Sequence, residues 1–184
     1  LQETIFNPLE MKDTGFSPRE DQLARFASSY TRNAKKELTL YDDAQSSDFL
    51  GRQYHSGGGG LVSTIGDYLN FCAMLANRGR FKNRQIIGRR TLDLMTANHL
   101  PGDVDLASIS MSGFSETANE GVGFGLGFAC KQDSVRGATP ASPGTYYWGG
   151  LASTLFWVDP AEDLLVVFMT QLLPSSTFNF RGQL

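Results

Sequence analysis

The chain has 184 residues, of which 41% are hydrophobic, and this is enough to build the core of one domain or of a piece of a larger one. The 16 Lys and Arg residues and the 19 Asp and Glu residues are spread along the chain, so the formal net charge of -3 argues against a nucleic-acid partner. No apolar run approaches the roughly 18 to 20 residues that cross a bilayer.

The N-terminal third is predicted to be mostly irregular. Residues 1–13 are expected to be the end of a helix that runs into a turn at Asn7-Pro8, because proline disfavours helical geometry in the residue before it. Residues 14–54 have no regular period and are expected to form surface loop, with a short helix within residues 18–28.

The clearest helix signal lies in residues 61–79, where Ile65, Tyr68, Leu69, Cys72, Leu75 and Ala76 recur at helical spacing. Thr64 and Asp67 have the spacing of a capping box, and Gly79 is a typical stop. A second helix is expected from Arg89 to Asn98. The short segment between the two helices would hold them together as neighbours.

The C-terminal half is predicted to supply an antiparallel sheet. Residues 100–120 read as a long loop, and residues 121–130 alternate Gly with apolar residues, which predicts a strand whose glycine face meets another backbone or a tightly packed helix. Residues 153–158 and 164–170 are rich in β-branched and aromatic residues and flank a turn at residues 159–163, so we expect a central hairpin covered on both faces. The fold class is therefore α+β, with an antiparallel sheet of at least three strands packed with helices.

The sequence gives little support for a metal or cofactor site. The glycine run at residues 57–60 lacks the Lys and the spacing of a phosphate-binding loop, so it reads as a tight turn. His55 and His99 have no carboxylate or thiol partner at metal spacing, and we assign no metal and no cofactor. Cys72 and Cys130 are expected to be buried or half-buried free thiols.

No local motif provides a nucleophile. The chain has no Gly-x-Ser-x-Gly, and helix capping explains Ser63 and Thr64 better than catalysis does. Tyr68-Leu-Asn70 has the spelling of a catalytic Tyr-x-Asn, but it lies inside the predicted helix, and we interpret it as a coincidence. Gly149 and Gly150 follow Trp148, where two residues without Cβ either bend the strand or let a backbone or ligand come close.

Four phrases in the chain, taken together, resemble the serine β-lactamase and penicillin-binding-protein-like hydrolases. They lie in residues 5–16, 58–67, 123–128 and 147–171, occur in the family's order and cover most of the chain. The likeness is to the class C-like branch that includes the family VIII carboxylesterases. In such enzymes a Ser-x-x-Lys supplies the nucleophile and its base, a Tyr-x-Asn supplies a tyrosine acid/base, and a Lys-Thr-Gly lies beside the cleft.

The resemblance implies a partial site at residues 148–151. Trp148-Gly149-Gly150 looks like the esterase-branch substitute for Lys-Thr-Gly, and Leu151 would offer its backbone N–H to the oxyanion hole. Trp148 would line the acyl or leaving-group side. Because Trp148 lacks the charge of a lysine, a neutral ester is a more plausible substrate than penicillin.

The chain also departs from the family pattern. No Ser is followed three residues later by Lys, and no Tyr-x-Asn precedes Ile5. We therefore expect residues 1–184 to be the C-terminal portion of a single β-lactamase-like domain, inactive alone, whose parent hydrolyses small-molecule esters or amides through an acyl-enzyme. Two alternatives are a non-catalytic binding or scaffold protein of the same fold, and an unrelated small binding domain.

Overall fold

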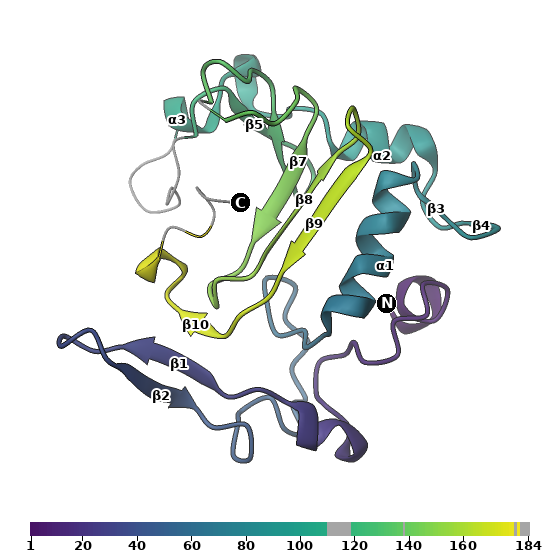
Figure 1. The fold of residues 1–184 in the computed structure, drawn as a ribbon. Helices are drawn as coiled ribbons and strands as arrows, with labels where there is room; N and C mark the ends of the chain where they lie inside the picture. Colours follow the sequence, from purple (N-terminus) through teal and green to yellow (C-terminus); the bar gives the residue numbers. More distant parts are fainter. Residues whose placement is uncertain (110–118, 138, 179, 181–184) are drawn as a thin grey trace.

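The computed structural model describes residues 1–109, 119–137, 139–178 and 180, and its centre is a five-stranded antiparallel sheet (Figure 1). The strand order follows the sequence, β5-β6-β7-β8-β9. The strands are β5 (Val122–Phe124), β6 (Ala129–Lys131), β7 (Tyr146–Gly149), β8 (Leu155–Asp159) and β9 (Leu164–Phe168). The predicted α+β class with an antiparallel sheet is confirmed.

The hairpin of β8 and β9 forms where the β-branched and aromatic runs predicted it. Its turn is closed by the Asp159 carboxylate, which accepts hydrogen bonds from the backbone N–H groups of Ala161 and Glu162 at 3.1 and 3.3 Å. The expected central position is wrong for β9, which is an edge strand of the described sheet and leaves Leu164 exposed.

The glycine-rich segment 121–130 forms a hairpin, β5 and β6, instead of the single strand expected. The chain reverses beside Gly127, whose φ of +99° lies in the left-handed region that favours glycine. The predicted close contact of the glycine face is confirmed, because a Cβ on Gly125 would lie 2.1 Å from the Met95 carbonyl oxygen.

Helix α1 (Ile65–Ala76) covers one face of the sheet. Thr64 caps it by accepting a hydrogen bond from the Asp67 N–H at 3.2 Å, as the spacing predicted. The predicted apolar face is rotated, since α1 buries Met74 with Cys72 and Leu75 but leaves Ile65 and Leu69 exposed. The helix stops before Gly79, which has a φ of +82°.

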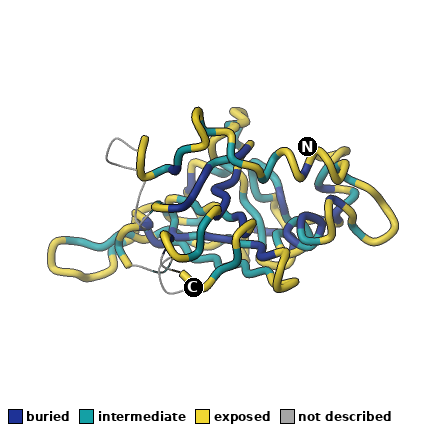
Figure 2. Tube along the Cα trace, turned by 90° about the horizontal axis from the view of Figure 1, so that it is seen from above, coloured by how far each residue is buried: buried dark blue, intermediate teal, exposed yellow. Residues whose placement is uncertain are grey.

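The hydrophobic core lies between α1 and strands β8 and β9. Figure 2 shows buried residues along the middle of the molecule and exposed residues in the projecting loops. The Tyr68 ring of α1 lies 5.4 Å from the Phe156 ring of β8. The buried residues of the cluster come from the N-terminal segment, both long helices and the sheet: Phe6, Leu9, Met11, Cys72, Met74, Leu75, Leu92, Phe128, Tyr146, Phe156 and Val158.

Between α1 and the sheet the chain forms several short elements. In chain order they are β3 (Arg80–Phe81), β4 (Arg84–Gln85), α2 (Arg89–Met95), the 3-10 turn η3 (Pro101–Asp103) and α3 (Leu106–Ile109). The predicted second helix is confirmed, although it ends earlier than expected. Within the expected long loop, residues 110–118 lie outside the described residues.

The N-terminal region contains a hairpin that the sequence did not predict. It is formed by β1 (Ser29–Arg32) and β2 (Leu38–Asp42), and it projects from the body of the molecule (Figure 1). On its other side, β1 pairs in parallel with β10 (Leu172–Leu173), so a distant part of the sequence completes this second sheet.

Short helical turns complete the chain. They are the expected helical turn at the start, η1 (Gln2–Phe6), the expected short helix η2 (Glu20–Arg25) and a final turn, η4 (Ser175–Thr177). Among the described residues, no helix combines the length and the apolar content that a membrane crossing requires.

Candidate functional site

The candidate site begins at the end of β7. Tyr146 is buried in the core, whereas Trp148, two residues on, is 38% exposed, so the strand runs from the interior to the surface. Trp148 pairs with Phe156 across the β7–β8 ladder, and paired side chains of an antiparallel sheet lie on the same face. The Phe156 ring contacts Tyr68 of α1.

A tight turn follows β7 and leads to β8. The Gly150 N–H donates to the Thr154 carbonyl oxygen at 2.8 Å, and the Ser153 N–H donates to the Gly150 carbonyl oxygen at 3.2 Å. A Cβ on Gly150 would lie 2.4 Å from Thr154 Oγ1. A side chain at position 150 would therefore require the Thr154 side chain to move.

Leu151 lies at the surface of this turn. Its side chain is exposed, and its backbone N–H donates no hydrogen bond to any other described residue. A backbone N–H held on a tight turn and free of an internal partner is the type of donor that stabilises a developing oxyanion.

The Trp148 indole is supported from the side by Phe124 of β5. Their ring centroids lie 5.0 Å apart at an interplanar angle of 75°, an edge-to-face contact. Phe124 is itself fixed by the loop after α2, because its N–H donates to Asn98 Oδ1 at 3.0 Å and its carbonyl oxygen accepts from the His99 N–H at 2.8 Å. The sheet thus presents a rigid aromatic wall beside residues 149–151.

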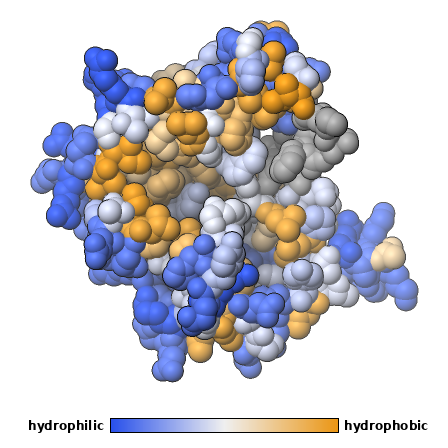
Figure 3. All heavy atoms as spheres, turned by 180° about the vertical axis from the view of Figure 1, so that it is seen from behind, coloured by the Kyte–Doolittle hydropathy of each residue, from blue (hydrophilic) through white to orange (hydrophobic). Residues whose placement is uncertain are grey.

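Apolar side chains are not confined to the core. Leu126 and Leu151 are exposed at the ends of the strands that carry Phe124 and Trp148. Figure 3 shows hydrophobic side chains gathered around a hollow on the face of the molecule that is turned away in Figure 1. The surface therefore offers apolar contact area beyond that of single scattered residues.

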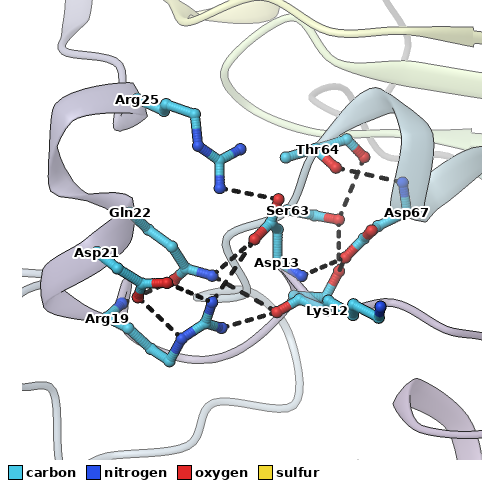
Figure 4. Close-up of polar contacts among 10 residues, drawn as sticks. Lys12, Asp13, Arg19, Asp21, Gln22, Arg25, Ser63, Thr64 and Asp67 are labelled. Atoms are coloured by element: carbon cyan, nitrogen blue, oxygen red, sulfur yellow. Dashed lines mark hydrogen bonds and ion pairs between the residues drawn. The ribbon is translucent and has the colours of Figure 1, made fainter.

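A polar cluster, separate from residues 148–151, lies at the start of α1 (Figure 4). Asp67 Oδ2 accepts hydrogen bonds from the Asp13 N–H at 2.7 Å and from Thr14 Oγ1 at 2.8 Å. Ser63 Oγ lies 2.8 Å from Thr14 Oγ1. The cluster is surrounded by ion pairs of Asp13 with Arg19 and Arg25. Its groups bind each other and fix the N-terminal segment to α1, which is a structural role.

Ser63, which the sequence predicts to serve in helix capping, and two further serines near the candidate sites have hydroxyls engaged by other groups. Ser63 Oγ contacts Thr14, Ser56 Oγ accepts a bond from the Gly58 N–H, and Ser153 Oγ donates to the Leu172 carbonyl oxygen. None of these partners is a Lys or a His, the side chains that would serve as a base.

The remaining reactive side chains are also occupied or inert. Tyr68 and Asn70 do not form a catalytic pair, since Tyr68 packs on Phe156 and Asn70 Nδ2 donates to the Leu9 carbonyl oxygen at 2.9 Å. Burial raises the pKa of the Cys72 thiol to about 12, so this thiol stays protonated at neutral pH.

The described residues contain no group of three or more His, Cys, Asp and Glu that could hold a metal ion. His55 stacks on Phe16 with ring centroids 4.5 Å apart, and His99 Nε2 lies 2.8 Å from the Leu94 carbonyl oxygen. The glycine run at residues 57–60 is separated from α1 by four residues and has no helix N-terminus beside it. Cys72 and Cys130 are both buried free thiols, as predicted.

The structure brings residues 148–151 together at one surface turn, and it adds two residues that the sequence did not single out. Phe124 supports the Trp148 ring, and Ser153 lies at the buried end of the turn. The sequence signals near Phe124 were the alternating glycines of residues 121–130 and the family phrase at residues 123–128, and neither assigned a role to this ring. Ser153 had no local signal, because its partner comes from β10.

Comparison with known proteins identifies the family of this chain. The model of the beta-lactamase family matches residues 1–183. Esterase EstB of Burkholderia gladioli is 28% identical over 185 residues, which covers 90% of this chain and 42% of EstB.

Two solved structures have the same fold at similar sequence identity. EstCE1, a hydrolase with promiscuous acyltransferase activity, has a TM-score of 0.75 and 27% identity over 94% of this chain and 45% of EstCE1. Simvastatin synthase (LovD) from Aspergillus terreus has a TM-score of 0.76 and 26% identity over 95% of this chain and 44% of LovD.

The chain thus spans less than half the length of these relatives, whereas the matches cover 90 to 95% of the chain itself. The family model, the sequence relative and the two structural matches all point to one family. The chain belongs to the beta-lactamase family.

Proposed function

We propose that this chain forms the oxyanion side of the active site of a serine hydrolase that acts on small neutral esters or amides through an acyl-enzyme. The observation that carries the proposal is the Leu151 N–H, which lies on a tight surface turn and donates to no described residue. An esterase and a hydrolase with acyltransferase activity among the similar proteins support the reaction class.

In the proposed reaction, a serine hydroxyl attacks the carbonyl carbon of the substrate and loses its proton to a base. The π electrons of the carbonyl move onto its oxygen, and the Leu151 N–H stabilises the negative charge that develops there. Collapse of this intermediate expels the alcohol or amine, which takes up a proton. Water then attacks the acyl-enzyme in a second addition and elimination and restores the serine.

The chain supports the choice of a neutral substrate. By the resemblance, Trp148 takes the place of the family's lysine, and its indole is held edge-to-face by Phe124. A tryptophan offers apolar contact and one N–H donor but no positive charge, so it cannot pair with the carboxylate of a β-lactam antibiotic. We therefore expect ester hydrolysis to exceed cephalosporin hydrolysis.

The nucleophile is expected in a part of the full-length protein that this chain does not include. The sequence contains no Ser-x-x-Lys, and the hydroxyls of Ser56, Ser63 and Ser153 bond to groups that cannot act as a base. The chain alone is therefore expected to be inactive.

The test is to incubate the full-length protein with p-nitrophenyl butyrate, with a chromogenic cephalosporin and with a serine-directed phosphonate. We expect ester turnover and labelling of one serine outside this chain. Absence of both would exclude the hydrolase and favour the non-catalytic scaffold. A stoichiometric adduct within residues 1–184 would show that the reactive serine belongs to this chain and would contradict the proposed division.

A further inference from the structure

Ser153 has a backbone conformation that is uncommon for its residue type. Its φ is +63°, in the left-handed region that non-glycine residues rarely adopt, and it is only 3% exposed. It lies two residues after Leu151, at the end of the same turn. A non-glycine residue held in this region at a candidate active site requires a contact that compensates the strain.

That contact is a buried hydrogen bond. Ser153 Oγ donates to the carbonyl oxygen of Leu172 at 2.7 Å, and the Leu172 N–H donates in return to the carbonyl oxygen of Ala152 at 3.2 Å. Two consecutive residues of the turn are thus bonded to a single residue of β10. The pair of bonds fixes both the position and the rotation of the peptide units at residues 152 and 153.

β10 is itself fixed by a second element. It pairs in parallel with β1, the Tyr30 N–H donates to the Gln171 carbonyl oxygen at 2.8 Å, and Ser29 Oγ donates to Gln171 Oε1 at 3.0 Å. In Figure 1, β10 connects the projecting hairpin with the end of the central sheet. The turn is therefore braced by the small sheet, outside the β7–β8 ladder that carries it.

We propose that Ser153 is a positioning residue, whose hydroxyl holds the turn of residues 150–153 so that the Leu151 N–H points at the developing oxyanion. This role rests on the proposed function of Leu151. Ser153 does not touch the substrate, because its hydroxyl is buried and already donates to Leu172. It acts through the backbone of the turn.

The role predicts a specific kinetic pattern. A donor that is displaced from the oxyanion loses stabilisation of the transition state much more than it loses ground-state binding. Variants of Ser153 should therefore lower kcat and leave KM almost unchanged. A residue that only stabilised the fold would lower the midpoint of thermal unfolding without this separation.

The experiment compares S153A, S153G and S153N in the full-length protein, with p-nitrophenyl butyrate as substrate. S153A keeps the left-handed strain without the anchor, and we expect kcat to fall about 10- to 100-fold with KM within about threefold of wild type. S153G removes the strain, and its kcat should fall less than that of S153A. Asparagine tolerates this φ and has a hydrogen-bond donor, so S153N should keep more of the wild-type kcat than S153A does.

Ser134→Ala is the matched control. Ser134 Oγ donates to the Ala141 carbonyl oxygen at 2.6 Å in the segment that enters β7 at its other end, so S134A removes the same type of bond away from the turn. Its kcat should stay within about twofold of wild type. A kcat of S153A that is also within twofold would overturn the proposal.

Hydrogen exchange gives a readout that does not depend on activity. In S153A the amides of Leu172 and of residue 153, which donate to the Ala152 and Gly150 carbonyl oxygens, should exchange at least about tenfold faster than in wild type, whereas in S134A they should not change. If the wild-type protein has no esterase activity, the proposed function fails, and the anchoring by Ser153 is then judged by exchange alone. Unchanged exchange in S153A, with or without activity, refutes the anchoring.

Discussion

The Asp67 carboxylate of α1 accepts a hydrogen bond from the Thr14 hydroxyl at 2.8 Å, across 53 residues of sequence. The same oxygen accepts the Asp13 N–H, so one buried carboxylate joins the N-terminal segment to the helix (Figure 4). Asp67 also follows the capping residue Thr64. The capping position that the sequence predicted thus has a second, tertiary role.

Asp67→Ala should therefore destabilise the full-length protein by about 2 to 3 kcal/mol, because it leaves the Thr14 hydroxyl and the Asp13 N–H without their charged acceptor. Asp67→Asn keeps an acceptor oxygen and should lose about half of that. The free energy of unfolding in urea measures both. Asp93→Ala, at an exposed position of α2, is the control and should change it by less than about 0.5 kcal/mol. Equal values for D67A and D93A would show that the carboxylate stabilises nothing.

The Asp105 carboxylate predicts how stability depends on pH. Hydrogen bonds from Ser108 and from the Gly121 N–H, together with the charge of Arg136, lower the pKa of Asp105 to about 2. In the unfolded chain the pKa of an aspartate is about 3.9. The unfolded state therefore takes up the proton first, and the stabilisation is complete above pH 4 and is lost as the pH falls towards 2.

Asp105→Asn should consequently lower the free energy of unfolding most at neutral pH. The difference between D105N and wild type should shrink as the pH falls from about 4 to about 2. Urea unfolding of the full-length protein at a series of pH values measures this. The variant S134A removes no ionisable group and serves as the control. The difference in its free energy of unfolding from that of wild type should not vary with pH. A D105N deficit that is constant down to pH 2 would contradict the assignment.

Gly125, which directly follows β5, leads to a steric prediction. A Cβ on Gly125 would lie 2.1 Å from the Met95 carbonyl oxygen, which is backbone and cannot rotate away. Gly125→Ala should cost about 3 kcal/mol or prevent folding. Gly58→Ala should cost nothing measurable, since no atom lies within 4 Å of its Cβ position and its φ is not positive. Comparable thermal midpoints for G125A and G58A would disprove the close contact.

Local signals predicted much of the fold. The hairpin of β8 and β9, helix α1 and helix α2 follow from residue type and spacing over neighbouring positions. The turn at Gly127 was missed because the alternation of Gly with apolar residues continues through it. The alternation does not distinguish one long strand from two short strands that fold back on each other.

The small sheet could not be predicted in the same way. Its strand β1 is completed by β10, and the Ser29–Gln171 bond joins residues 142 positions apart. The same non-local contact underlies the role proposed for Ser153. For the candidate site, the resemblance supplied Trp148 and Leu151, whereas the residues that support them come from tertiary pairing and had no local signal.

The oxyanion role of Leu151 can be separated from its side chain. The Leu151 side chain is exposed, so Leu151→Ala should leave kcat for p-nitrophenyl butyrate within about threefold of wild type. Leu151→Pro removes the N–H, and the preceding Gly150 has no Cβ to clash with the proline ring. Leu151 also lies outside the left-handed region, which proline cannot adopt.

We therefore expect L151P to lower kcat by about 10²- to 10³-fold, which is the effect of removing one oxyanion donor. Steady-state kinetics of full-length L151A and L151P measure the difference, and circular dichroism and the thermal midpoint check that both fold. Phosphonate labelling of L151P should be slower than that of wild type, because addition at phosphorus develops a similar charge on oxygen. Wild-type turnover in a folded L151P would place the oxyanion donor elsewhere, and a loss in L151A equal to that in L151P would assign the effect to the side chain.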